Sequence, residues 1–173
     1  MTQLELFSSL RAALESERAL LRTLIDQIPD LVYVKDRDSR FVIANMATAL
    51  LMGASSADDL IGLCDHDFYP TAMADQFRVD ERTVMEQGVD LMNHEERAVD
   101  PLGTDRWLLT SKRPLRDGSS GRIIGLIGIG RDITMRRMTE QALHQAHAAL
   151  KERARVDQEE ITRLKAELAA AKR

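Results

Sequence analysis

The chain has 173 residues, of which 44% are hydrophobic and 30% charged, and its formal net charge is −4. This length fits one compact domain with extensions. The sequence holds no basic block, so its charge does not favour a nucleic-acid partner. No apolar run approaches the roughly 18 residues that span a bilayer, and the one cysteine, Cys64, excludes an internal disulfide framework. We therefore expect a cytoplasmic protein without a membrane span.

The first segment, residues 1–28, has the pattern of an amphipathic helix. Its apolar positions alternate at spacings of three and four residues, with Glu17 as the one polar interruption: Phe7, Leu10, Leu14, Leu21, Leu24 and Ile28. Pro29 ends the helix, because the residue before a proline disfavours helical backbone. An apolar seam of this kind needs another surface to bury it.

The middle segment, residues 29–134, changes to strand-like patterns separated by turns. Strands are predicted at 31–34, 41–43, 91–99, 106–113 and 122–133. Short helices are predicted near 45–52 and 70–87, where Gly53 and Gly88 end them. This order indicates an α+β fold, in which an antiparallel sheet carries helices on one face.

The last segment, residues 135–173, contains neither glycine nor proline and is predicted to be one helix. A heptad frame places ten residues at its two seam positions: Glu140, Leu143, His147, Leu150, Ala154, Asp157, Ile161, Leu164, Leu168 and Ala171. Such a stripe predicts a coiled coil, because a helix this polar is marginal when isolated. His147 and Asp157 are polar seam positions, so we expect a loosely paired section at residues 154–161.

The middle segment resembles a PAS domain of the kind found in bacterial signalling proteins, such as the sensor regions of histidine kinases. The matching pieces are Ile28-Pro29-Asp30 with Val34-Lys35-Asp36, Phe41-Val42-Ile43-Ala44-Asn45, Leu60-Ile61-Gly62, Trp107, and Gly128 through Thr134 followed by Met135-Arg136-Arg137. The resemblance implies a five-stranded antiparallel sheet in spatial order 2-1-5-4-3, with short helices that form a pocket on one face. It also implies a parallel homodimer continued by a coiled coil.

A pocket between the sheet and the helices would take a small apolar ligand. The residues that the resemblance places in its lining are Tyr33, Ile43, Met52, Phe68, Met73, Phe77, Trp107, Leu109, Ile127 and Ile129. Small-molecule pockets are mainly apolar with a few polar groups, which agrees with this set. The alternative is that these side chains only fill the core of a small domain.

The cofactor remains unknown, but two groups known in the family are not expected. Photoactive flavin relatives use an Asn-Cys-Arg-Phe-Leu-Gln run, which the surroundings of Cys64 do not match. Haem-binding relatives ligate iron through a histidine on the long helix, and residues 70–87 contain none. His94 is expected on a solvated strand face, and the consecutive run 65–67 is not expected to converge on a metal.

No catalytic constellation is recognised, so we do not expect an enzyme. Gly125, Gly128 and Gly130 do not form a dinucleotide fingerprint, because they precede a strand end. Their expected role is close backbone packing.

The junction between the last strand and the C-terminal helix is expected to relay a signal. In the family, an Asp-x-Thr ending ties this strand to the connector helix, which here implies Asp132 and Thr134. Asp132 could exchange between Arg131 and Arg136, giving two arrangements; the alternative is a simple helix cap. The sequence thus predicts a dimeric sensory or interaction module that regulates an effector such as a histidine kinase. The alternatives are a docking scaffold with a filled core, and a fragment of a sensor histidine kinase or cyclase.

Overall fold

A computed structural model describes residues 3–171. The chain divides after Ile133 into two compact units, which are described separately. The first contains the helix α1 (Gln3–Asp26) and all of the sheet, and the second is the single helix α4 (Thr134–Ala171). No helix within the described residues is long and apolar enough to cross a membrane.

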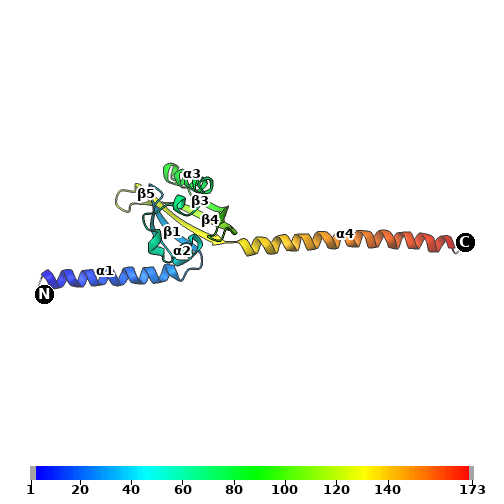
Figure 1. Cartoon of the computed structure of the whole chain (residues 1–173), viewed down its shortest axis with the longest axis horizontal. Coiled ribbons are helices and arrows are strands. Elements are labelled where there is room, and N and C mark those ends of the chain that lie inside the picture. The colour runs from blue at the N-terminus through cyan, green and yellow to red at the C-terminus, as the bar shows by residue number, and fades with distance from the viewer. Residues whose placement is uncertain (1–2, 172–173) are drawn as a thin grey trace. The chain divides into compact units, whose positions relative to one another are not determined.

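The centre of the first unit is a five-stranded antiparallel sheet (Figure 1). Its strands are β1 (Leu31–Asp36), β2 (Phe41–Ala44), β3 (Leu91–Val99), β4 (Asp105–Arg116) and β5 (Ile123–Asp132). Their order across the sheet is β2-β1-β5-β4-β3, and every neighbouring pair is antiparallel. The predicted α+β fold and strand order are confirmed.

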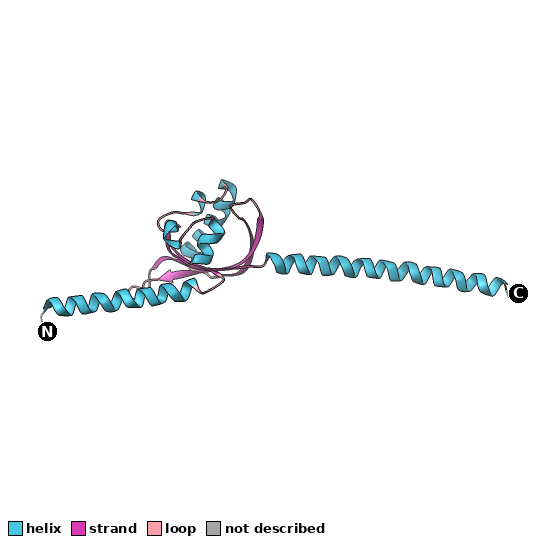
Figure 2. Ribbon diagram, turned by 60° about the horizontal axis from the view of Figure 1, so that its bottom comes forward, coloured by secondary structure: helices cyan, strands magenta, loops and turns pink. Residues whose placement is uncertain are grey.

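Short helices lie between β2 and β3 and cover one face of the curved sheet (Figure 2). They are α2 (Met46–Met52), two 3-10 turns, η1 (Ala57–Leu60) and η2 (Asp65–Asp67), and α3 (Thr71–Gln87). Gly53 and Gly88 end α2 and α3 in the left-handed conformation, which glycine adopts without a steric penalty. The apolar core between helices and sheet includes Tyr33, Phe41, Leu60, Val84 and Leu126.

Asn45 joins the end of α1 to the sheet and to α2. Its fully buried side-chain amide donates to the carbonyl oxygens of Ile25, Ile28 and Asp30 at 2.9–3.1 Å. Its side-chain oxygen accepts from the backbone N–H groups of Val32 and Thr48 at 3.0 and 3.1 Å. One asparagine therefore satisfies backbone groups of three elements, and it fixes where the N-terminal helix ends.

The two predicted seams are exposed in the single chain. In α1 the exposed apolar side chains are Phe7, Leu10, Leu14, Leu21 and Leu24, with Ile28 just beyond the helix. In α4 they include Leu143, Leu150, Ile161, Leu164 and Leu168, and His147 is also exposed. The helix α4 runs without a break through residues 154–161, so the loosely paired section there stays a prediction.

Candidate functional site

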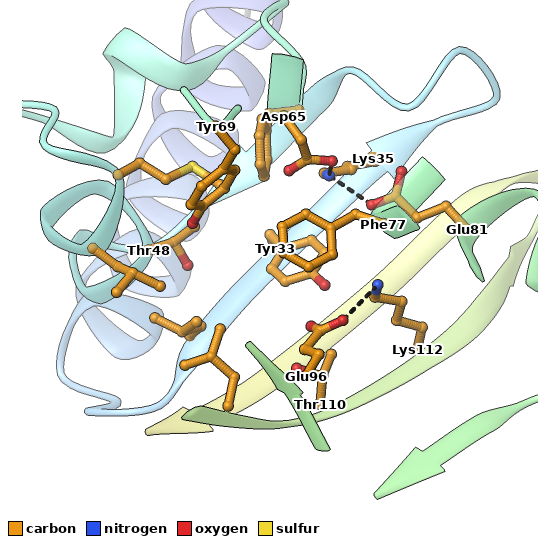
Figure 3. Close-up of a pocket in the computed structure, with 15 residues that line it drawn as sticks. Tyr33, Lys35, Thr48, Asp65, Tyr69, Phe77, Glu81, Glu96, Thr110 and Lys112 are labelled. Carbon is orange, nitrogen blue, oxygen red and sulfur yellow. Dashed lines mark hydrogen bonds and ion pairs between the residues drawn. The ribbon is translucent and has the colours of Figure 1, made fainter. Parts of the chain in front are cut away.

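A small cavity of about 30 Å³ lies between the sheet and the helices (Figure 3). One buried water molecule needs a cavity of about 10–15 Å³, so this cavity has room for about two water molecules. Its wall combines aliphatic, aromatic and charged side chains: Leu31, Tyr33, Lys35, Phe41, Thr48, Leu51, Met52, Asp65, Tyr69, Phe77, Glu81, Glu96, Leu108, Thr110 and Lys112. The charged members make this wall more polar than the apolar pocket predicted from the sequence.

Lys35 is the most enclosed charge of the wall. It lies two residues after Tyr33 on β1, so both side chains point to the helix-covered face. Its ammonium contacts the Asp65 carboxylate from η2 and lies 2.6 Å from the Glu81 carboxylate on α3. The side chain is 2% exposed, and its Nζ lies 4.4 Å from the centre of the Phe41 ring. A lysine excluded from water in this way is held charged by two anions and an aromatic face.

The ion pairs shift the pKa values of the groups that form them. Burial by itself lowers the pKa of Lys35, but the Glu81 and Asp65 carboxylates outweigh it and the net pKa is raised. Burial raises the pKa of the Glu81 carboxyl, although the Lys35 ammonium opposes that shift. Burial also raises the pKa values of Tyr33 and Tyr69, so both phenols stay neutral and can donate hydrogen bonds.

A second buried lysine faces the same cavity from β4. Lys112 is 1% exposed, and its ammonium lies 3.4 Å from the Glu96 carboxylate on β3 and 5.4 Å from the centre of the Phe77 ring. Its contact with Glu96 is longer than the contacts of Lys35. Lys112 is therefore the less tightly held of the two cations.

Two polar atoms of the wall lack hydrogen-bond partners within the described residues. These are Oε2 of Glu81 and the hydroxyl oxygen of Thr110, and both are buried. An unpaired buried polar atom costs about 1–3 kcal/mol. These atoms are suited to meet hydrogen-bonding groups of water or of a small polar molecule.

Of the ten predicted lining residues, the structure brings Tyr33, Met52 and Phe77 to the cavity. Phe68 and Met73 pack against the core beside it, but they do not form its wall. Five predictions are wrong, because these side chains lie on the opposite face of the sheet: Ile43, Trp107, Leu109, Ile127 and Ile129. Alternate residues of a strand point to opposite faces, and on β4 and β5 the prediction took the wrong set.

Glycine on β5 explains part of this error. Gly128 is paired with Tyr33 across β1 and β5, and a Cβ atom built on Gly128 would lie 2.1 Å from the Tyr33 ring. The face of β5 toward the cavity therefore carries a glycine so that the tyrosine ring can lie over it. Ile127 and Ile129, which were predicted in the wall because they are apolar, lie on the outer face of β5.

The charged residues of the wall are not predicted from the sequence. The sequence contains a signal for them. Lys35 lies two residues from Tyr33, and Lys112 lies four residues from the buried Leu108, so each lysine points to the same face of its strand as that residue. Glu81 lies four residues after Phe77, on the same face of α3. Once the inward face of each strand is assigned, the two lysines fall on it by their spacing alone.

The predicted relay residues have different partners from those expected. The Arg131 guanidinium forms a two-pronged contact with Asp30, at 2.7 Å and 3.0 Å, and this contact lowers the pKa of the Asp30 carboxyl. In this arrangement Arg131 is paired with Asp30, and the exchange of Asp132 between Arg131 and Arg136 stays a prediction. Asp132 lies 3.7 Å from the Arg106 guanidinium, and Arg106 also contacts Asp100 at 2.9 Å. Thr134 is the first residue of α4.

The strand order and the cavity on the helix-covered face define the class of protein. The family model described as the PAS fold matches residues 25–138, and the chain belongs to this family. It is 36% identical over 133 residues to the aerobic respiration control sensor protein ArcB of Escherichia coli K12, covering 76% of this chain and 17% of ArcB. It is 31% identical over 117 residues to a diguanylate cyclase of Vibrio cholerae, covering 67% of this chain and 36% of the cyclase.

A solved structure of VqmA bound to DPO is also similar. The two chains are 36% identical with a TM-score of 0.58, and the match covers 64% of this chain and 55% of VqmA. The chain thus corresponds to a minor part of the two curated relatives and to about half of VqmA. It is a PAS sensory domain related to the sensor regions of signalling proteins.

Proposed function

We propose that this domain senses a small polar molecule, which it binds in the cavity around Lys35 and Lys112. The observation that carries the proposal is the pair of unpartnered buried atoms in the wall, Glu81 Oε2 and Thr110 Oγ1. Buried polar groups are normally satisfied by protein or by water, so these two atoms are positions where a polar ligand can supply the missing hydrogen bonds. The fact that VqmA, 36% identical over the matched region, binds DPO supports a small-molecule ligand.

The wall suggests the chemistry of the ligand. An N–H or O–H group would donate to Glu81, and an acceptor would take a hydrogen bond from Lys112 or from the Tyr33 phenol. The rings of Tyr69 and Phe77 meet edge to face, with their centres 5.4 Å apart, and offer apolar surfaces for a flat ring. A small heterocycle with adjacent donor and acceptor atoms fits this set better than the apolar ligand expected from the sequence.

The size of the cavity couples binding to a structural change. A ring-sized ligand exceeds the space of about two waters, so side chains such as Met52 and Leu51 must move to admit it. A ligand shifts a conformational equilibrium only when it binds the two states with different affinity. A ligand that requires an expanded wall meets this condition.

The proposed route of the signal runs along the sheet to the start of α4. The backbone N–H of Ile133 donates to the carbonyl oxygen of Trp107 on β4 at 2.8 Å. Asp132, the last residue of β5, lies beside Arg106, which is also on β4. A shift of β4 at Leu108, Thr110 and Lys112 would therefore reach the last residues of β5. We infer that Asp132 and Thr134 then pass the change to a C-terminal coiled coil of a parallel homodimer. That coiled coil would regulate an effector such as a histidine kinase.

Ligand binding is tested with DPO and, separately, with a set of small hydroxylated nitrogen heterocycles chosen for their adjacent donor and acceptor atoms. The full chain is titrated with each compound by calorimetry, while fluorescence follows Trp107, the one tryptophan of the chain. We expect at least one compound to bind, to change the Trp107 emission, and to lose affinity at least about tenfold in Thr110→Val. Arg113→Met, on the outer side of the same strand, is the matched control and should bind normally. The proposal is wrong if no compound binds, or if Thr110→Val binds as the wild type does.

A docking scaffold is the alternative function, and one observation favours it. The two lysines already have carboxylate partners inside the cavity, and the free space amounts to about two waters. A scaffold would use the domain for dimerisation without a ligand, and the heterocycle titration separates the two functions. The chain could also be the sensor part of a larger kinase or cyclase, since it spans 17% of ArcB and 36% of the cyclase.

A further inference from the structure

Three potential metal ligands lie close together between α3 and β3. None of them was predicted from the sequence as a site residue. Asp80 comes from α3, and His94 and Glu96 lie two residues apart on β3, on the same side of that strand. One ligand atom of each residue lies within 4.8 Å of those of the other two. From the sequence alone, His94 is expected on a solvated strand face, and no metal site is expected. The fold brings Asp80 of α3 close to this pair, which sequence spacing does not reveal.

We propose that Asp80, His94 and Glu96 bind a divalent first-row transition metal, with Zn²⁺ as the reference ion. One imidazole nitrogen and two carboxylate oxygens are ligands that such ions accept, and three protein ligands with an open position are a common arrangement. The site goes beyond the proposed ligand cavity and does not depend on it.

The burial of the ligands supports this assignment. Asp80 Oδ2 is buried and has no hydrogen-bond partner within the described residues, and it lies 3.9 Å from His94 Nε2. The Glu96 side chain is 10% exposed, and its contact with Lys112 is long, at 3.4 Å. An unpaired carboxylate oxygen and a second carboxylate with one long ion pair, both beside an imidazole, form an electrostatic arrangement that a cation stabilises.

The distances agree with binding after small rotamer adjustments. Ligand atoms that bind Zn²⁺ at about 2.1 Å lie at most about 4.2 Å apart. The separation of Asp80 Oδ2 and His94 Nε2, 3.9 Å, already falls within this limit. His94 is 44% exposed, so one side of the site faces solvent, where water completes the coordination.

Glu96 links this site to the cavity, because it belongs to both. A metal on Glu96 would weaken its contact with Lys112 and would also repel the Lys112 ammonium. The bound metal would therefore change the position or the partners of a wall residue. A metal ion could in this way act as a second input to the domain.

The inference is tested by titrating the full chain, free of any affinity tag, with Zn²⁺ by calorimetry and with Co²⁺ by visible absorption. We expect one equivalent to bind, and His94→Ala and Asp80→Asn each to weaken Zn²⁺ binding at least about tenfold. His66→Ala is the matched control, because His66 also lies beside an aspartate, Asp75, at 2.8 Å. That variant should bind as the wild type does.

Nuclear magnetic resonance supplies a readout that does not depend on affinity. Zn²⁺ should shift the side-chain ¹⁵N signal of His94 and the backbone amides near Glu96 and Lys112, and leave the His66 ring unchanged. Circular dichroism verifies that each variant is folded. The inference is overturned if the wild type binds no Zn²⁺ at about 100 μM, a concentration that would almost fill a site with a Kd of about 1 μM. It is equally overturned if the folded His94→Ala variant binds Zn²⁺ with unchanged affinity.

Discussion

Lys35 is the residue on which the integrity of the cavity depends most. Its ammonium is buried between Asp65 and Glu81, and neither carboxylate can reach bulk water in the folded domain. A buried ion pair adds little net stability compared with an apolar substitute, but the removal of one partner is costly. The cluster therefore imposes a specific arrangement on β1, η2 and α3 more than it stabilises the fold.

Lys35→Met should lower the free energy of unfolding by about 3–5 kcal/mol, because it leaves two buried carboxylates without their cation. Urea denaturation measures the loss. Arg113→Met, which removes an exposed ion pair with Asp90, should cost about 1 kcal/mol or less. Adding Asp65→Asn and Glu81→Gln to Lys35→Met should restore part of the stability. If Lys35→Met and Arg113→Met lowered the free energy of unfolding equally, the structural role of Lys35 would be contradicted.

The raised pKa of Glu81 predicts a pH dependence with a definite sign. Between the ordinary glutamate value of 4.5 and the raised folded value, the folded chain holds one more proton than the unfolded chain. The contribution of Glu81 to the free energy of unfolding therefore increases as pH falls through this window. Urea denaturation at a series of pH values from the alkaline side down toward 4.5 should show this gain in the wild type but not in Glu81→Gln. Parallel pH profiles of the two proteins would refute the assignment.

At the residue scale, the sequence predicted only part of the site. Tyr33, Met52 and Phe77 were predicted in the wall because they are large apolar residues on elements that the resemblance identified. Lys35, Glu81 and Lys112 were not predicted, because a charged residue is normally expected at the surface and its burial depends on partners distant in sequence. Such pairs become visible only when the fold places the elements together.

At the element scale, Arg131 and Asp30 connect the two ends of the PAS domain. Asp30 follows the turn that ends α1, and Arg131 is the penultimate residue of β5. Their two-pronged contact joins the beginning of the sheet to its last strand. This contact and Asn45 together hold the exit of α1 against the strands that lead to α4.

Asp30→Asn should weaken this connection. We expect a loss of about 0.5–1 kcal/mol in the free energy of unfolding, because Arg131 is largely exposed and water screens the pair. We also expect faster amide hydrogen exchange at Gly130 and Arg131, measured by mass spectrometry. Asp38→Asn, in the exposed turn between β1 and β2, is the control and should change neither quantity. Unchanged exchange at the end of β5 in Asp30→Asn would contradict the connecting role.

The elements themselves were predictable, for physical reasons that differ along the chain. Pro29, Gly53 and Gly88 mark helix ends that local backbone sterics alone dictate. The strands were visible from period-two patterns, and the resemblance supplied their order. The 3-10 turn that carries Asp65 was not predicted, because three residues give no periodic signal.

At the scale of the whole molecule, three surfaces of the described chain are exposed: the seam of α1, the helix α4 and the outer face of the sheet. The 38 residues of α4 include no buried side chain, although its leucines follow a heptad. On the outer face of the sheet, Ile43, Ile127 and Ile129 are 38–49% exposed. An isolated helix of this composition is marginal in water, and contiguous apolar patches mark interaction sites. Pairing of two chains would cover the α4 seam and give the proposed signal a rigid output.

The central claim is that paired helices carry the signal of the PAS cavity, and pairing is its precondition. Light scattering coupled to size-exclusion chromatography tests it on the full chain at micromolar concentration. The account predicts a mass twice the 19.5 kDa of one chain. Leu150→Lys, on the seam, should shift the mass toward that of one chain, whereas Gln145→Lys, on the opposite side of the heptad, should not. A wild-type mass of 19.5 kDa at that concentration would contradict the claim.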